Sequence, residues 1–325
     1  MIVSVDKRMG AFAFVFPGQG SQSVGMLDAW GDHPVVLRTL EEASDALDED
    51  LGQLIAQGPK EALAMTTNTQ PVMLVAGVAA YRVWLHEGGA VPSVVAGHSL
   101  GEYSALVASG VLSLAQAAPL VRFRAQAMQE AVPAGQGAMA AILGLPAEHV
   151  MQVCESVQAT FDASSAEVVQ AVNFNDPKQT VIAGSRLAVE LAMAALKETG
   201  AKRALALPVS APFHSSLMKP AAERLAQRMA DVEWQAPTIP LVNNVDVAVE
   251  TDVARIRDAL VRQAYGPVRW VECIGAIHAR GVSAVIECGP GKVLAGMTSR
   301  IQADLASAAV YDPATLAQVQ EMLQA

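Results

Sequence analysis

The feature that most limits the fold of this chain is a repeated order of segments. A short apolar run ends at glycine or proline and is followed by a long alanine-rich segment with helical periodicity. Residues 11–16 and 91–97 are apolar runs of this kind, and helical segments are predicted at 34–47, 70–85 and 100–109. Strands that alternate with helices favour a parallel sheet with helices on both faces. The sequence therefore predicts an α/β fold.

The pattern changes in the middle of the chain. Residues 133–207 give the order strand, helix, strand, strand, helix, strand, which is the ferredoxin-like signature. The first pattern resumes after residue 208. We predict a large α/β-hydrolase-like domain with a parallel sheet, made of residues 1–132 and 208–325, and an inserted small ferredoxin-like domain at 133–207. A chain of 325 residues is long enough for both.

Composition excludes several classes of protein. The 22 basic and 32 acidic residues give a net charge of −10, which disfavours non-specific binding of nucleic acid. No apolar segment is long enough to span a membrane. The three cysteines are too widely spaced for a disulfide framework or a zinc site, and no metal is expected. We expect a cytoplasmic protein. The role of residues 1–10 stays open, since Met9 is an alternative start.

The segment Gly97-His98-Ser99-Leu100-Gly101 is the motif G-x-S-x-G, and it stands between a predicted strand and a predicted helix. A sharp turn there would strain Ser99 and expose its hydroxyl. The N–H of Leu100 would lie at the start of the helix, where it could stabilise an oxyanion. The alternative is a glycine-rich turn with an incidental serine.

A serine nucleophile needs a base. His98 is poorly aimed, because neighbouring residues on a strand point to opposite faces. His214 follows a predicted strand in a loop, where catalytic residues concentrate. The four other histidines are expected at the surface: His33, His86, His149 and His278.

Several motifs occur in a fixed order. They are Phe-Pro-Gly-Gln-Gly-Ser-Gln at 16–22, Gly-His-Ser-Leu-Gly-Glu-Tyr-Ser at 97–104, Arg-Phe-Arg at 122–124, Pro-Phe-His at 212–214 and Glu-Cys-Gly-Pro-Gly-Lys-Val-Leu at 287–294. Together they resemble the malonyl-CoA:acyl-carrier-protein transacylases of fatty-acid and polyketide synthesis. The resemblance extends from about residue 12 to about residue 301, which is nearly the whole chain.

The resemblance implies a role for each catalytic position. Ser99 is the nucleophile and His214 is its base. The main-chain N–H groups of Gln19 and Leu100 form the oxyanion hole. In this family a main-chain carbonyl, and not a carboxylate, orients the histidine, and Gln263 occupies that supporting position. A neutral orienting group suits an anionic substrate. The alternative for Gln263 is a solvated helix residue.

The resemblance also implies the substrate contacts. Arg124 matches the arginine that holds the malonyl carboxylate, and a guanidinium can do so through two parallel hydrogen bonds. Its alternative is a surface arginine paired with an acid. Met128 either lines the pocket or fills the core. Phe213 matches the position that correlates with extender choice, so its ring predicts malonyl over methylmalonyl groups, an effect of about 1–3 kcal/mol for one methyl group.

The implied partner is an acidic carrier protein, which an acidic chain can bind only through a local basic patch. Lys202, Arg203 and Arg300 match positions that the family uses for this docking. Solvated surface charge is the alternative for all three.

The implied reaction is ping-pong transfer of a malonyl group from malonyl-CoA to the phosphopantetheine thiol of acyl carrier protein, with no metal or cofactor and with a monomeric enzyme. It would supply extender units for fatty-acid synthesis. Three alternatives remain: a discrete polyketide acyltransferase, a serine esterase or thioesterase, and a non-catalytic module that binds carrier protein.

Overall fold

The structure is a computed structural model that describes residues 10–162, 164–209 and 211–324. Residues 1–9, whose role the sequence leaves open, lie outside this range. No helix within the described ranges has the length and apolar character needed to cross a membrane. The chain forms two compact units. Unit 1 consists of Met1–Pro119, Gln235–Val242 and Ile274–Ala325, and unit 2 consists of Leu120–Trp234 and Asn243–Cys273.

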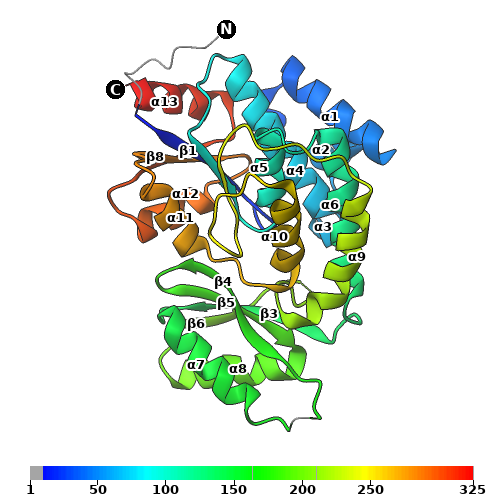
Figure 1. Cartoon of the computed structure of the whole chain (residues 1–325), viewed down its shortest axis with the longest axis vertical. Coiled ribbons are helices and arrows are strands. Elements are labelled where there is room, and N and C mark those ends of the chain that lie inside the picture. Colours follow the sequence, from blue (N-terminus) through cyan, green and yellow to red (C-terminus); the bar gives the residue numbers. More distant parts are fainter. Residues whose placement is uncertain (1–9, 163, 210, 325) are drawn as a thin grey trace. The chain divides into compact units, whose positions relative to one another are not determined.

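Unit 1 is built on a parallel sheet of five strands in the spatial order β7-β2-β1-β8-β9. The strands are β1 (Phe12–Phe16), β2 (Val94–Gly97), β7 (Leu241–Val242), β8 (Ala284–Cys288) and β9 (Ala306–Val310). In Figure 1 the dark-blue strand β1 lies beside the brown strand β8, although they come from opposite ends of the chain. Strand β1 is buried along its whole length, as expected for a central strand of a parallel sheet.

Helices surround this sheet. In unit 1 they are α1 (Pro34–Leu47), α2 (Leu51–Gln57), α3 (Lys60–Ala64), α4 (Thr66–His86), α5 (Gly101–Ala108), α12 (Val293–Ile301), α13 (Pro313–Gln324) and the short 3-10 helix η1 (Asp28–Trp30). Helix α4 packs on β1 through aromatic rings. Trp84 meets Phe14 edge to face with ring centroids 5.3 Å apart, and Tyr81 meets Phe14 at 5.9 Å. Helices α6 (Leu114–Glu130) and α11 (Trp270–His278) contribute residues to both units.

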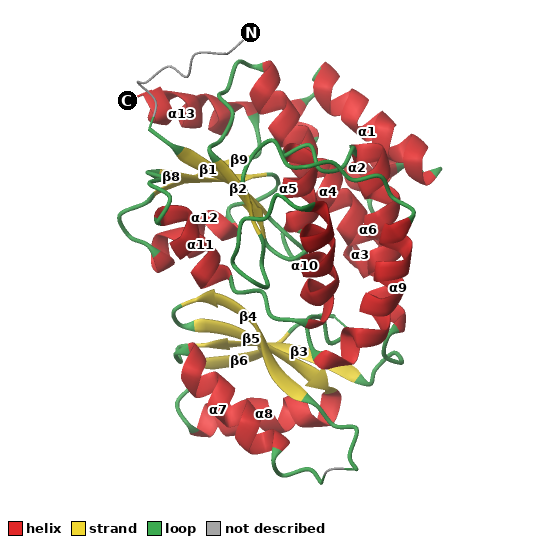
Figure 2. Ribbon diagram, viewed as in Figure 1, coloured by secondary structure: helices red, strands yellow, loops and turns green. Residues whose placement is uncertain are grey.

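Unit 2 contains an antiparallel sheet in the order β4-β5-β3-β6. Its strands are β3 (Gly137–Leu143), β4 (Val169–Asp176), β5 (Gln179–Ser185) and β6 (Arg203–Ala206). Figure 2 shows α7 (Ala147–Gln158) and α8 (Arg186–Glu198) on one face of this sheet. Ile142, Val150, Ile182 and Leu196 are buried between sheet and helices. The remaining helices of the unit are η2 (Ser216–Met218), α9 (Lys219–Ala230) and α10 (Val253–Tyr265).

The mixed α/β architecture predicted from the sequence is confirmed, with one parallel and one antiparallel sheet. The sequence analysis missed α2, α3, β9 and α13. Helices α2 and α3 have only seven and five residues, too few for a clear periodicity. Strand β9 has the sequence Ala-Ser-Ala-Ala-Val and lies at the edge of its sheet, so it lacks the large apolar side chains that mark a buried strand.

The carboxyl group of Glu287 lies in the core of unit 1. Glu287 is on β8 with no exposed surface, and its Oε2 accepts a hydrogen bond of 2.9 Å from the N–H of Ala295. Burial raises the pKa of Glu287 from the usual 4.5 to about 7, although main-chain N–H groups at the start of α12 act in the opposite direction. The folded chain therefore binds this proton more tightly than the unfolded chain does.

We expect a pH-dependent loss of stability from this group. Its contribution is complete below pH 4.5 and is lost as the pH rises to about 7, a change of about 3 kcal/mol in the free energy of unfolding. In Glu287→Gln the side chain cannot ionise, so the variant should become more stable than the wild type above about pH 7. Urea unfolding of both proteins at a series of pH values measures this. Parallel curves for the two proteins between pH 4.5 and about 7 would contradict the prediction.

Candidate active site

Ser99 stands at a sharp turn between β2 and α5. Its φ of 53° lies in the left-handed region, which is unfavourable for a side chain with a Cβ and is typical of functional turns. The turn requires glycine on both sides. A Cβ on Gly97 would lie 1.9 Å from the carbonyl carbon of Gly101, and one on Gly101 would lie 2.0 Å from the oxygen of Phe16. Each glycine of G-x-S-x-G is therefore needed for close packing of the main chain.

The loop after β1 lies beside this turn. Strands β1 and β2 are parallel neighbours with Phe16 opposite Gly97, so the residues that follow each strand meet at one edge of the sheet. The N–H of His98 donates to the oxygen of Phe16 at 3.0 Å. A Cβ on Gly18 would lie 2.5 Å from the oxygen of His98. Unit 1 thus places the loop of Gln19 next to the turn that carries the serine.

Gln19 and Leu100 provide the predicted oxyanion donors from these two loops. Gln19 is half-buried, and its Nε2 donates to Oγ1 of Thr66 at 3.3 Å. Leu100 is buried and immediately precedes the first residue of α5, where N–H groups have no partner within the helix. The role of both N–H groups stays a prediction.

Unit 2 contains the predicted base. His214 has a φ of 65° and only 4% of its surface is exposed. Its Nδ1 lies 2.7 Å from the main-chain oxygen of Gln263. A carbonyl oxygen can only accept, so Nδ1 carries the proton and donates it. In the neutral ring, Nε2 then carries the lone pair that a general base requires.

Gln263 also contacts the predicted carboxylate-binding residue. Its Oε1 accepts a hydrogen bond of 2.9 Å from Nη2 of Arg124, and its Nε2 lies 3.5 Å from Oδ1 of Asn244. Gln263 has no exposed surface and Arg124 has 1%. The alternatives of a solvated helix residue and a surface arginine are therefore wrong. One residue joins the base, through its main chain, to the buried guanidinium, through its side chain.

Apolar side chains surround this part of unit 2. Met128 and Phe213 are both buried and belong to one cluster that also contains Ala211 and Met218. Phe213 immediately precedes His214. The cluster can exclude water next to the histidine and the arginine, but it also fills a core, so both interpretations of Met128 remain.

The predicted docking residues are exposed and lie in different units. In unit 2, Lys202 immediately precedes β6 and Arg203 is its first residue, and in unit 1 Arg300 is on α12. The candidate catalytic residues divide in the same way. Ser99, Leu100 and Gln19 belong to unit 1, and the other five belong to unit 2: Arg124, Met128, Phe213, His214 and Gln263.

Asn244 is a neighbour of the candidate site that no sequence motif indicated. Asn244 has no exposed surface and lies next to the amide of Gln263. A signal was available, because Asn243 and Asn244 directly follow the apolar residues of strand β7. Polar residues that follow strands of a parallel sheet often form a site.

Comparison with known proteins shows the class to which this α/β fold belongs. The family model described as "Acyl transferase domain" matches residues 13–317. The chain therefore belongs to the acyl transferase family.

Individual relatives are similar over nearly their whole length. A malonyl CoA-acyl carrier protein transacylase of Salmonella typhimurium is 54% identical over 95% of this chain and 98% of the relative. An acyl-carrier-protein S-malonyltransferase from Burkholderia pseudomallei has a crystal structure that covers 96% of this chain and 99% of its own, with 61% identity and a TM-score of 0.93. A malonyl-transacylase solved in complex with a type II PKS acyl-carrier protein is 51% identical over 96% of this chain and 99% of its own, with a TM-score of 0.92.

Proposed function

We propose that this protein transfers the malonyl group from malonyl-CoA to the phosphopantetheine thiol of acyl carrier protein and so supplies extender units for fatty-acid synthesis. The observation that carries this proposal is the buried Arg124, whose guanidinium is held by the same residue that orients His214. A guanidinium can hold a carboxylate through two parallel hydrogen bonds, and a malonyl group carries a free carboxylate. The names of the relatives point to the same reaction.

The chemistry follows two half-reactions. Nε2 of His214 takes the proton of Ser99 Oγ, and the oxygen attacks the thioester carbonyl of malonyl-CoA. The N–H groups of Gln19 and Leu100 stabilise the oxyanion. Coenzyme A leaves as a thiol with the proton from His214. The phosphopantetheine thiol then gives its proton to His214 and attacks the malonyl-serine, which releases Ser99. No step requires a metal or a cofactor.

Arg124 provides the selectivity for an acid-bearing acyl group. Its guanidinium binds the malonyl carboxylate, while Met128 and the ring of Phe213 bound the apolar part of the pocket and disfavour an α-methyl group. Gln263 is neutral, so it positions both Arg124 and His214 without repelling the substrate.

A substitution at Gln263 should separate these two functions. Gln263→Ala keeps the main-chain carbonyl that accepts from His214 but removes the Oε1 that accepts from Arg124. We expect a rise in KM for malonyl-CoA of about tenfold, from loss of a charge-assisted hydrogen bond, and an unchanged pH profile of kcat. Steady-state kinetics across the pH range test this. A shifted pH profile with an unchanged KM would contradict the proposed division of roles.

The carrier protein would dock on the exposed basic residues Lys202, Arg203 and Arg300. We expect the double variant Lys202→Glu/Arg203→Glu to raise KM for acyl carrier protein by about tenfold, because it replaces attraction by repulsion toward an acidic partner. The rate of Ser99 acylation by malonyl-CoA should not change, so the two half-reactions are measured separately. An unchanged rate with carrier protein refutes the docking role.

The finer architecture is part of the proposal. We describe the fold as an α/β-hydrolase-like domain, residues 1–132 and 208–325, with a ferredoxin-like domain inserted at 133–207. The element order β3-α7-β4-β5-α8-β6 and the strand order β4-β5-β3-β6 support the second description. The protein would act as a monomer in the cytoplasm, and its three cysteines, all buried and not joined in disulfides, agree with a reducing compartment.

The test of the function is the mass of the intact protein after exposure to malonyl-CoA. We expect one malonyl adduct on the wild type and none on Ser99→Ala. The adduct should persist in water and disappear on addition of holo acyl carrier protein. Rapid hydrolysis without a carrier would favour the esterase alternative, and no adduct would favour the non-catalytic module. Relative rates with fatty-acid and type II polyketide carriers distinguish the two pathways.

A further inference from the structure

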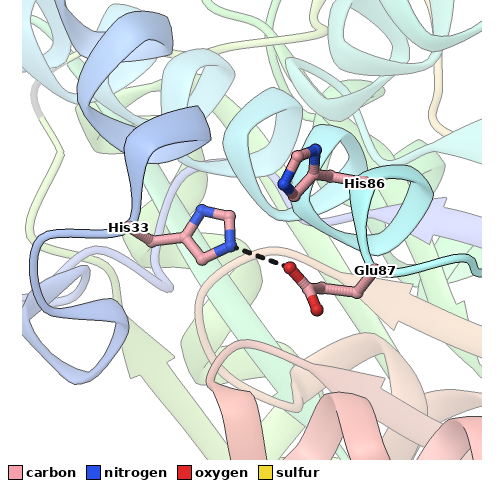
Figure 3. Close-up of side chains that lie close together, drawn as sticks. All are labelled: His33, His86 and Glu87. Atoms are coloured by element: carbon pink, nitrogen blue, oxygen red, sulfur yellow. Dashed lines mark hydrogen bonds and ion pairs between the residues drawn. The ribbon is translucent and has the colours of Figure 1, made fainter.

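Three side chains of unit 1 that the proposed reaction does not use lie together: His33, His86 and Glu87. Figure 3 shows the two imidazole rings and the carboxylate facing one another. One donor atom from each lies within 4.8 Å of the other two. Two imidazoles and one carboxylate form a common ligand set for zinc in proteins.

The spacing of these donors suits a metal ion. For three atoms that are at most 4.8 Å apart, there is always a point that lies no more than about 2.8 Å from each. Zinc takes nitrogen and oxygen ligands at about 2.0–2.2 Å. Each donor therefore needs to move by less than about 0.8 Å, which small rotations of two exposed side chains and the half-buried His33 can supply.

The main chain around the three donors is well anchored. His33 is the N-cap residue of α1, and its Nδ1 accepts from the N–H of Val35 at 3.2 Å. His86 is the last residue of α4, and Glu87 is the C-cap residue of the same helix. The main-chain oxygen of Glu87 accepts from Nε2 of Gln320 at 2.9 Å. Two helix ends therefore hold the donors at a fixed separation.

We propose that His33, His86 and Glu87 form a binding site for a first-row divalent transition-metal ion, with Zn²⁺ the preferred ion and water in the remaining position. The borderline donors favour Zn²⁺ over Mg²⁺ or Ca²⁺, which take oxygen ligands. The bound ion ties the start of α1 to the end of α4 and so stabilises the folded chain by mass action.

Binding of a metal ion would break two hydrogen bonds of the His33 ring and so would lower the affinity. Nδ1 of His33 accepts, so the proton of the neutral ring is on Nε2, which lies 3.2 Å from Oε1 of Glu87. A metal ion on Nε2 displaces that proton to Nδ1 and ends the cap on Val35. Loss of an N-cap weakens binding by about fivefold. The carboxylate of Glu87 then binds the ion and no longer accepts a hydrogen bond from the imidazole of His33.

The experiment is titration of the full chain, without any added histidine tag, with Co²⁺ as a spectroscopic probe and then with Zn²⁺ as competitor. We expect the visible absorption of a four-coordinate Co²⁺ site, displaced by Zn²⁺. His33→Asn is the main variant, because asparagine is a strong N-cap residue and keeps α1 capped. His33→Asn, His86→Ala and Glu87→Gln should each weaken Zn²⁺ binding by about tenfold or more.

The matched control is His278→Ala. His278 and Asp304 form a second histidine–carboxylate pair of 3.2 Å in unit 1, and the pair is not part of the three-donor cluster. This variant should bind Co²⁺ and Zn²⁺ as the wild type does, and Zn²⁺ should raise its melting temperature equally. If the Co²⁺ spectrum persists in His33→Asn and His86→Ala, the ion binds elsewhere and the proposal is wrong. The absence of Co²⁺ absorption from the wild type also overturns it.

Discussion

Ser99→Ala is expected to lower kcat/KM for malonyl transfer by about 10⁵-fold or more, as loss of the nucleophile does in other serine enzymes. The oxygen that forms the acyl-enzyme is absent from the variant, whereas the oxyanion donors and the substrate contacts remain. Alanine has the same Cβ as serine, so the left-handed turn is no more strained than before. The measurement is transfer of labelled malonyl groups to holo acyl carrier protein.

Two further variants make this test specific. Ser156→Ala removes an exposed serine of α7, whose hydroxyl donates to the main chain of Gln152, and should keep the full rate. Ser99→Cys retains a nucleophile at the same place and should still take the malonyl label. Label on Ser99→Ala equal to that on the wild type would show that another residue is acylated.

Arg124→Met should abolish the preference for malonyl over acetyl groups. We expect kcat/KM for malonyl-CoA to fall by about 10²–10³-fold, because the substrate carboxylate loses a bidentate, charge-assisted partner in a buried site. The rate with acetyl-CoA should change much less, since an acetyl group has no carboxylate for the guanidinium to hold. The ratio of the two rates is the quantity to measure.

The ratio of the malonyl-CoA and acetyl-CoA rates also distinguishes loss of the Arg124 contact from a general loss of stability. Arg124 is almost fully buried, so its replacement can destabilise unit 2. Such a loss would lower both rates together and leave their ratio unchanged, which would contradict the proposed role. Arg122→Met is the matched control, because it makes the same substitution two residues earlier on α6 and thus on a different side of the helix. It should keep the malonyl preference.

The sequence predicted the parts of the fold that local signals define. The predicted helix at 34–47 coincides with α1, and the predicted strand before Ser99 ends at Gly97 as observed. Glycine and proline mark these boundaries through their backbone preferences. The pairing of β1 with β8 is different, because these strands lie far apart in the sequence and no local pattern encodes which strands become neighbours.

For the candidate site, too, the sequence predicts local geometry but not contacts between distant residues. Ser99 stands in a five-residue motif whose geometry can be derived from the residues alone, and the structure shows the turn that was expected. Arg124, His214 and Gln263 were identified by resemblance to a family, position by position. The resemblance did not predict the contact between Arg124 and the amide of Gln263, which are 139 residues apart. It also did not indicate that Asn244 lies beside that amide. Such contacts depend on tertiary packing, which motifs do not record.

The main-chain oxygen that binds His214 affects which mutations an enzyme of this kind can tolerate. The group that fixes the imidazole is a peptide carbonyl, which every amino acid provides at position 263. Point mutation there can alter the amide that supports Arg124 while it leaves the histidine tautomer intact. In a Ser-His-Asp enzyme a single mutation can remove the orienting group. In the proposed mechanism, acyl-group recognition could therefore evolve at this position without loss of the group that orients the base.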